Sequence, residues 1–401
     1  MKKVLFFVGE FPSLSETFVL NQIVSMIKWG YDVRVLSIRR NHEVMLHDEN
    51  DAQDILGKSD YLFSKDEWAC KYKIFLQSAI NSFTKPQRFK ILADDGLLAF
   101  CAVNAFYAAD SEIRGFQPDV IISHFGPTGV IAQAIIESDS IFDNVKHMVF
   151  FHGYEMSEHK TFRRYLPSYR KMAKSKTLFL PISNYWDKKL KSSISSINSH
   201  IVRMGVDVNL FAFNNVPHTF KKKIKLFSAC RFVEKKGIEY AIRACASLNL
   251  DYSYDIAGNG PLSDDLSNLI ISLGVQDKVR LIGPLKSHEV AEKISMSDIY
   301  ILPSVTASNG DMEGIPVALM EAMSSGVLCL STYHSGIPEL IKDGVSGFLV
   351  PEKDAHALSE KIIYISKLSE GELSAIRNAA RRHVEESFNV ERELKKLCSL
   401  F

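Results

Sequence analysis

The sequence has 401 residues, a length that suits two or three domains. With 46% hydrophobic and 24% charged residues it has the composition of a globular protein, and a net charge of +1 argues against an electrostatic nucleic-acid binder. The six cysteines are scattered without a CxxC pair, which argues against a zinc knuckle or a redox pair.

The first apolar run, Val4–Val8, breaks at Gly9 and Glu10. It is shorter than the apolar region of a signal peptide, so we expect a first β-strand there. Elsewhere no apolar run approaches the ~20 residues needed to span a bilayer. These features favour a cytoplasmic protein.

Short apolar runs alternate with segments of helical periodicity. In the first half, the runs expected to form buried strands are Val4–Val8, Val33–Ile38, Val120–Ser123, Met148–Phe151 and Leu178–Ile182. Helices are expected between them, for example over Glu16–Trp29 and Thr128–Glu137. The pattern restarts after Asp207, with runs at Ile224–Ala229, Tyr252–Ala257, Val279–Ile282, Ile299–Leu302 and Val327–Leu330. Continuous apolar strands alternating with helices predict two doubly wound α/β domains with parallel sheets.

The expected division places one Rossmann-like domain at residues 1–207 and a second at 208–385, followed by a terminal segment, 386–401. The boundary falls in Asp207–Lys223, which contains turn residues and a run of lysines. In open α/β sheets, ligands bind beyond the carboxyl ends of the strands. Two such domains facing each other would therefore form a cleft, and the motifs below fall at strand ends.

Two histidines end strands of the first domain. His152 follows the run that ends at Phe151, and His124 follows Ser123. Such positions would point both side chains toward the cleft. A structural role in the core is the alternative for a lone histidine, and His124 could also cap the next helix.

The segment Cys230–Gly237 follows the first strand of the second domain and places Arg231 and Lys236 in a strand-to-helix loop. Two cations there would neutralise a diphosphate, the arginine through paired hydrogen bonds and the lysine as a point charge. The alternative is a solvated basic loop. The next strand ends in Ala257–Pro261, where two glycines form either a simple tight turn or a close approach to a base or phosphate.

The most informative segment is Glu313–Glu321, in which seven residues separate two glutamates. A buried strand is expected to end at Pro303, and a helix to begin near Pro316, where proline suits a first turn. Glu313 would then precede the helix, and Glu321 would lie about two turns further on. Because the first turn has free N–H groups that bind anions, the segment predicts acceptors for sugar hydroxyls beside donors for a phosphate. A simple cap is the alternative for Glu313.

From Glu313 to Val350 the sequence resembles the retaining glycosyltransferases of family 4, also called glycosyl transferases group 1. The resemblance extends from about Lys2 to the C-terminus, and Phe11–Phe18 is similar to the branch that builds bacterial exopolysaccharides such as colanic acid. It implies a GT-B fold, with two Rossmann-like domains facing a central cleft and the segment 386–401 crossing back to the first domain. The implied activity is transfer of a hexosyl group, with retention, from a UDP-linked donor to a lipid-linked saccharide in exopolysaccharide or lipopolysaccharide biosynthesis.

The resemblance also implies roles for individual residues. The catalytic residues would be His152, Glu313, Arg231 and Lys236. The donor-binding residues would be Arg231, Lys236, Gly258, Asn259, Gly260, Leu285, Glu313, Gly314, Ile315, Pro316 and Glu321. His124 and Glu16 would lie on the acceptor side.

The first domain departs from the family pattern at two places. The loop Gly9–Glu16 lacks the paired glycines that many members have there, and Glu155 stands where the family usually has aspartate. What the first domain contributes to donor binding therefore stays open.

Neither a metal nor a cofactor is expected beyond the nucleotide-sugar co-substrate, because no Asp-x-Asp motif is evident. Basic-aromatic stretches at Lys71–Lys90 and Arg163–Lys191 are either solvated helix faces or patches that contact the inner face of the cytoplasmic membrane. Two other functions stay open. A nucleotide-sugar 2-epimerase of GT-B architecture would turn over its substrate without an acceptor, and a non-catalytic sugar-nucleotide-binding protein would not turn it over at all.

Overall fold

A computed structural model describes residues 1–13, 16–41, 55–64, 71–83, 88–108, 115–213 and 223–401. Part of the expected domain boundary, 214–222, lies outside the described residues, as do 84–87 of the first basic stretch.

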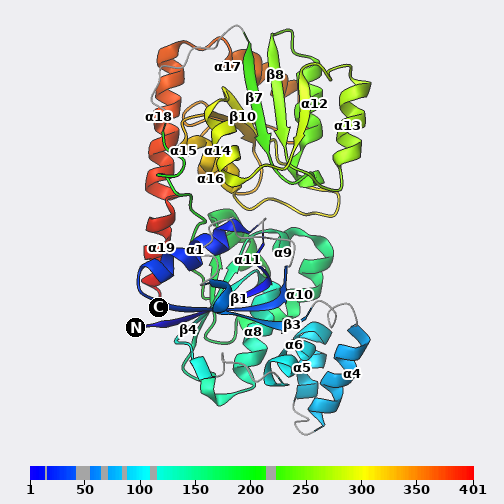
Figure 1. The fold of residues 1–401 in the computed structure, drawn as a ribbon, viewed down its shortest axis with the longest axis vertical. Coiled ribbons are helices and arrows are strands. Elements are labelled where there is room, and N and C mark those ends of the chain that lie inside the picture. Colours follow the sequence, from blue (N-terminus) through cyan, green and yellow to red (C-terminus); the bar gives the residue numbers. More distant parts are fainter. Residues whose placement is uncertain (14–15, 42–54, 65–70, 84–87, 109–114, 214–222) are drawn as a thin grey trace.

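Two six-stranded sheets form the framework of the molecule, one in each half of the chain (Figure 1). The first has the strand order β3-β2-β1-β4-β5-β6 and the second β12-β11-β10-β7-β8-β9, and all pairings are parallel. The first comprises β1 (Lys3–Phe11), β2 (Asp32–Arg40), β3 (Ser59–Phe63), β4 (Val120–His124), β5 (Lys146–Phe151) and β6 (Leu178–Pro181). The second comprises β7 (Ile224–Ala229), β8 (Tyr252–Ala257), β9 (Val279–Gly283), β10 (Ile299–Ile301), β11 (Leu328–Thr332) and β12 (Phe348–Val350). Both orders are doubly wound, so the predicted pair of α/β domains is confirmed.

Each sheet is buried on both faces, which explains the continuous apolar runs. In β1, Phe6 belongs to one core cluster and its neighbour Phe7 to another. In β7, Leu226 and Phe227 divide in the same way. Successive side chains of a strand point to opposite faces, so a strand covered on both sides needs apolar residues throughout.

The helices cover these faces and link the strands. In the first half they are α1 (Thr17–Lys28), α4 (Lys71–Ser82), α5 (Phe89–Asp94), α6 (Gly96–Ala108), α8 (Gly126–Glu137), the 3-10 helix η2 (Ser140–Phe142), α9 (Tyr154–Ser157), α10 (His159–Met172) and α11 (Asn184–Ser193). In the second half they are the 3-10 helix η3 (Glu234–Lys236), α12 (Ile238–Ala246), α13 (Ser263–Ser272), α14 (Ser287–Ser295), α15 (Val317–Ser324), α16 (Ile337–Leu340), α17 (Ala355–Ile365), α18 (Glu370–Ser387) and α19 (Val390–Cys398). Within the described residues, none of them combines the length and apolar character that crossing a bilayer requires.

The last two helices connect the halves of the molecule. Helix α18 runs along the second domain and α19 continues onto the first, close to the N-terminus (Figure 1). Leu394 and Leu397 of α19 belong to a core cluster of the first sheet. The backbone of Val206 accepts from Val390 N–H at 3.1 Å and donates to Phe388 O at 2.8 Å. Because α18 continues to Ser387, the division expected at residue 386 falls in its last turn.

Candidate active site

Loops from opposite domains meet where β5 and β10 end. His152 and Gly153 follow β5, and Gly314 lies between β10 and α15. A Cβ on Gly314 would lie 2.4 Å from the His152 carbonyl oxygen, so this approach requires glycine. The Met312 N–H donates to Ser157 Oγ at 3.0 Å in the same contact. The fold thus brings the His152 loop of the first domain against the Glu313 loop of the second.

Glu313 is buried and forms an ion pair with Lys236. Its Oε2 lies 3.0 Å from Lys236 Nζ, and Oε1 lies 4.0 Å from Lys235 Nζ. Burial alone would raise the pKa of Glu313, but the charges of Lys236 and Lys235 outweigh it and hold that pKa below its usual value. Burial likewise opposes the charge of Lys236, yet Glu313 raises the pKa of that lysine. Two predicted catalytic residues, 77 positions apart in the sequence, therefore form one charged pair.

The neighbouring cations differ in their partners. Lys235 Nζ lies 3.1 Å from Asp311 Oδ2, whereas Lys236 points to Glu313. Arg231 is exposed and has no side-chain partner among the described residues. The two lysines of this loop thus have different partners, and Arg231 is open to a ligand.

Helix α15 begins at Val317, one residue after the predicted start. Pro316 is its N-cap, with an extended ψ of 122°, so it precedes the first turn and does not open it. Glu321 lies within the helix and is half-buried without an ion-pair partner in the described chain. Burial raises the pKa of Glu321 to about 7. The two glutamates of one motif therefore have opposite electrostatic environments.

The loops that follow β7, β8 and β9 are joined by backbone hydrogen bonds. Phe232 N–H donates to Asn259 O at 2.7 Å, and Gly258 N–H donates to Gly283 O at 2.8 Å. A Cβ on Gly258 would lie 1.9 Å from Cys230 O, and one on Gly260 would lie 2.5 Å from Phe232 O. The glycines thus allow one loop to pack on another, and their predicted contact with the donor stays a prediction.

Two more predicted donor residues flank these loops. Leu285 follows β9 and packs half-buried against the core cluster that contains Phe227. Ile315, between Gly314 and Pro316, is buried in the same cluster. Both therefore support the loops at the carboxyl edge of the second sheet.

His124 and His152 form a buried pair. His124 Nδ1 lies 3.1 Å from His152 Nε2, and the rings of Phe18 and Phe125 lie 4.8 and 4.4 Å from that of His152. Burial lowers the pKa of His124 to about 3 and that of His152 well below its usual value, so both rings are neutral. His124 has no exposed surface and lies behind His152. An acceptor could touch His124 only after neighbouring rings moved, unlike the acceptor-side position predicted for it.

The Glu155 carboxylate accepts two hydrogen bonds from the backbone of the His152 loop. Its two oxygens accept the backbone N–H groups of His152 at 2.7 Å and Gly153 at 3.0 Å. Burial, partly offset by these hydrogen bonds, raises the pKa of Glu155 to about 7. Glu16, the half-buried N-cap of α1, has its pKa raised to about 7 by burial and by repulsion from Glu10 and Glu155. Among the residues that the structure describes, neither carboxyl group has an ion-pair partner comparable to Lys236.

Sequence reasoning missed a second set of groups around Glu313. The Glu313 N–H donates to His334 Nε2 at 3.0 Å, and Ser335 Oγ donates to Glu313 O at 2.7 Å. His334 Nδ1 lies 2.6 Å from Glu352 Oε1, and the His334 ring is fully buried. A histidine just beyond the end of a strand, the signal that singled out His152, would have identified His334 after β11.

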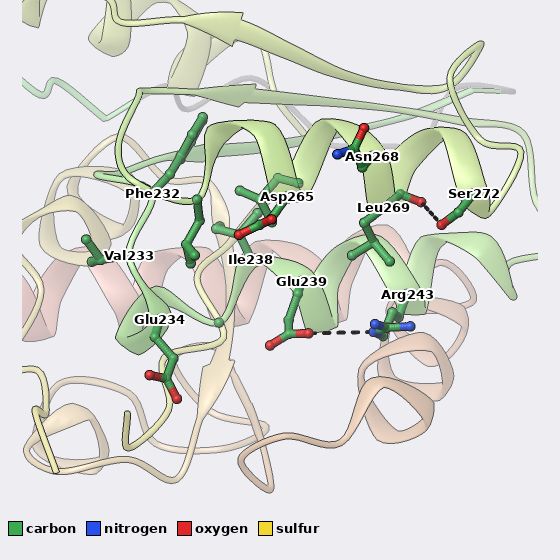
Figure 2. Close-up of a pocket in the computed structure, with 13 residues that line it drawn as sticks. Phe232, Val233, Glu234, Ile238, Glu239, Arg243, Asp265, Asn268, Leu269 and Ser272 are labelled. Atoms are coloured by element: carbon green, nitrogen blue, oxygen red, sulfur yellow. Dashed lines mark hydrogen bonds and ion pairs between the residues drawn. The ribbon is translucent and has the colours of Figure 1, made fainter. Parts of the chain in front are cut away.

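A cavity of about 430 Å³ lies between α12 and α13 (Figure 2). Phe232, Leu266 and Leu269 line it, and an ion pair between Glu239 and Arg243, 3.7 Å long, crosses its edge. None of the predicted site residues lines this cavity.

Comparison with known proteins identifies relatives over the whole chain. A model of the family described as "Glycosyl transferases group 1" matches residues 212–383. The "Putative colanic acid biosynthesis glycosyltransferase WcaL" of Salmonella typhimurium is 34% identical, over 99% of this chain and 99% of its own length. The "Amylovoran biosynthesis glycosyltransferase AmsK" of Erwinia amylovora is 33% identical, over 99% of this chain and 98% of its own.

Solved structures share the fold at low sequence identity. The sucrose-phosphate synthase of Thermosynechococcus elongatus superposes with a TM-score of 0.75 at 15% identity, covering 100% of this chain and 98% of that one. HepE of Anabaena in complex with UDP-glucose gives a TM-score of 0.72 at 14% identity, covering 100% and 99%. The expected GT-B architecture is confirmed.

Proposed function

The chain belongs to the glycosyl transferases group 1 family and is a glycosyltransferase, and from this premise we propose that it moves a hexosyl group from a UDP-linked donor to a lipid-linked saccharide with retention of configuration. The full-length similarity to WcaL and AmsK supports a role in bacterial exopolysaccharide biosynthesis. The UDP-glucose in the HepE complex supports UDP as the carrier.

The Lys236–Glu313 ion pair is the observation that carries this proposal. Without a donor, the two groups neutralise each other beside the first turn of α15. A bound donor would give each its own partner, because diphosphate oxygens accept from Lys236 while sugar hydroxyls donate to Glu313. Arg231, exposed in the adjacent loop, would add a second cation.

In the proposed reaction, an acceptor hydroxyl attacks the anomeric carbon from the side of the departing diphosphate. The new glycosidic C–O bond forms as the bond between the anomeric carbon and the diphosphate oxygen breaks, and the hydroxyl proton passes to the diphosphate. Lys236, Arg231 and the α15 N-terminus would stabilise the growing negative charge. Glu321 would accept hydrogen bonds from the ribose diol, and neutral His152 would contact the donor sugar.

A basic surface at the start of α10 supports an anionic, lipid-linked acceptor. A cavity of about 300 Å³ is lined by His159, Lys160, Arg163 and Arg164. Within the described part of the chain, Lys160, Arg163 and Arg164 have no ion-pair partner, and the His159 N–H donates to Asn309 O at the interdomain contact. We propose that this surface meets the phosphates or membrane beside the acceptor, at the inner face of the cytoplasmic membrane.

The rest of the second basic stretch has its charges partly compensated. Lys171 lies 2.8 Å from Asp95, and Lys191 lies 2.7 Å from Asp187. Lys189 Nζ lies over the Trp186 ring, 5.2 Å from its centroid. Arg163 and Arg164 are therefore a better test of membrane contact than the lysines of α11.

Donor and activity are tested in two steps. A thermal-shift screen of UDP-glucose, UDP-galactose and other nucleotide-sugars should give the largest rise for the true donor, since a ligand at 100 times its Kd stabilises by about 2.7 kcal/mol. Transfer to polyprenyl-diphosphate-linked saccharides should then yield a product with the donor's anomeric configuration, read by NMR. Inversion would contradict retention, and transfer only to lipid-free saccharides would contradict the acceptor.

The same assays separate the alternative functions. Conversion of the donor to its C2 epimer without any acceptor would favour an epimerase. Nucleotide-sugar binding without turnover across the acceptor panel would favour a non-catalytic binding protein.

Membrane contact is tested by flotation with anionic vesicles. Arg163→Glu with Arg164→Glu should weaken binding at low salt, because each basic residue near an anionic surface contributes about 1 kcal/mol. Lys191→Glu is the matched control, since Asp187 already compensates that charge. An equal loss of vesicle binding in both variants, or vesicle binding that does not weaken at high salt, would contradict the proposed surface.

A further inference from the structure

The turn after β11 forms hydrogen bonds with both the N–H and the carbonyl group of Glu313. The Glu313 N–H donates to His334 Nε2 at 3.0 Å, while Ser335 Oγ donates to the Glu313 carbonyl at 2.7 Å and lies 3.3 Å from that of Gly314. Ser335 has a φ of 49°, the left-handed region that L-residues seldom adopt. Each polar group of the Glu313 backbone thus meets one side chain of this turn.

The tautomer of His334 follows from these contacts. A backbone N–H can only donate, so Nε2 of His334 accepts and the ring proton lies on Nδ1. That Nδ1–H donates to Glu352 Oε1 at 2.6 Å, and Glu352 Oε2 also accepts the Thr306 N–H at 2.7 Å. The ring has no exposed surface, so water cannot replace either bond without rearrangement.

We infer that His334 is a positioning residue for the glycosyl transfer, acting with Ser335 and Glu352 to set the place from which Glu313 reaches the donor sugar. This inference rests on the proposed role of Glu313. The Glu313 carboxylate has one strong partner, Lys236, which is also assigned to the diphosphate. When the donor draws Lys236 away, the hydrogen bonds between the Glu313 backbone and the side chains of His334 and Ser335 remain, and they fix the point from which the carboxylate extends. A displacement of about 1 Å at a reacting group can cost ~100-fold in rate.

The test separates positioning from simple stability. His334→Leu should lower the rate of UDP release from UDP-glucose or UDP-galactose by about 10–100-fold, with the affinity for free UDP nearly unchanged, because UDP lacks the sugar that Glu313 holds. His334→Gln keeps an acceptor and a donor and should recover most of the rate. His147→Leu is the matched control: His147 is also buried and hydrogen-bonded, to Ser123 at 3.1 Å, but lies in the first sheet. It should lower the melting temperature without changing turnover per folded molecule.

A double-mutant cycle decides whether His334 acts through Glu313. In the Glu313→Ala background, His334→Leu should cause almost no further loss, since coupled residues are not additive. Losses that multiply would overturn the inference while leaving the role of Glu313 intact. Full activity of Glu313→Ala itself would overturn both the inference and the proposed role. If His334→Leu does not fold, Ser335→Ala replaces it in the cycle, with a smaller expected loss of about 3–10-fold for one neutral hydrogen bond.

Discussion

The charged pair of the site belongs to one domain and the neutral histidine pair to the other. In the second domain, Glu313 stays charged because Lys236 lies 3.0 Å away, and Arg231 is exposed beside them. In the first domain, His124 and His152 are buried and neutral, and the pKa of Glu155 is raised to about 7. Buried groups without a counter-charge lose their charge, whereas paired groups keep it.

This difference suggests a division of labour. In the proposed reaction, the departing diphosphate would be stabilised by cations that are present before the reaction, Lys236 and Arg231 of the second domain. The neutral groups of the first domain suit hydrogen bonds to hydroxyls, which sugars and acceptors carry in excess. The comparison therefore predicts that removing a cation from the second domain lowers turnover more than any other change discussed below.

Removing a second-domain cation is the strongest test. Lys236→Ala and Arg231→Ala should each lower kcat by about 10²–10³, the typical worth of a group aimed at developing charge. Lys235→Ala is the matched control and should stay near wild type, because Lys235 pairs with Asp311. Steady-state kinetics decide the matter. Were Lys235→Ala the damaging variant, the lysine would be misassigned by one position.

The second test compares the separate effects of removing Glu313 and Glu321. Glu321→Ala should weaken UDP binding by about 1.5–3 kcal/mol, the cost of a hydrogen bond to a charged group, while Glu313→Ala should mainly lower turnover. Titration calorimetry with UDP measures the first effect and UDP release from the donor measures the second. Equal loss of UDP affinity in both variants would contradict the assignment.

The sequence predicted the buried parts of the fold well. All ten expected strands are present, because their apolar runs fill sheets covered on both faces. The two missed strands lie at sheet edges: β3 has four half-buried residues among five, and β12 has only three residues. β3 is mostly half-buried, so its sequence carries little apolar pattern, and β12, although fully buried, is too short for periodicity to reveal.

The site was predictable only as far as local motifs extend. Lys236 and Glu313 were identified from separate segments, but their ion pair arises from tertiary packing. The same holds for the His124–His152 hydrogen bond. His334 stands just beyond a strand, as His152 does, but its contact with the Glu313 backbone arises from tertiary packing.

The pH dependence of UDP binding is the third test. The raised pKa of Glu321, about 7, means that its carboxyl group is protonated below pH 7 and charged above it. Ribose hydroxyls donate best to the charged form. With a pKa of about 7, the charged fraction falls from about nine-tenths at pH 8 to about one-tenth at pH 6, so affinity should fall about tenfold. Glu321→Gln should remove this component while keeping that of the UDP phosphates. An identical pH profile in the variant would show that Glu321 does not titrate in binding.

The smallest expected effect is that of chelation. If Lys236, Arg231 and the α15 N-terminus neutralise the diphosphate, turnover should be unchanged in excess EDTA, since the stabilising charges belong to the protein. Donor turnover before and after chelation, with and without added Mg²⁺ or Mn²⁺, measures this. Lys236→Ala sharpens the result: because it lacks one cation, added Mg²⁺ should recover part of its lost rate, whereas the intact enzyme should not respond. Complete loss of wild-type activity on chelation, restored by either ion, would overturn the assignment of charge stabilisation to the second domain's own side chains.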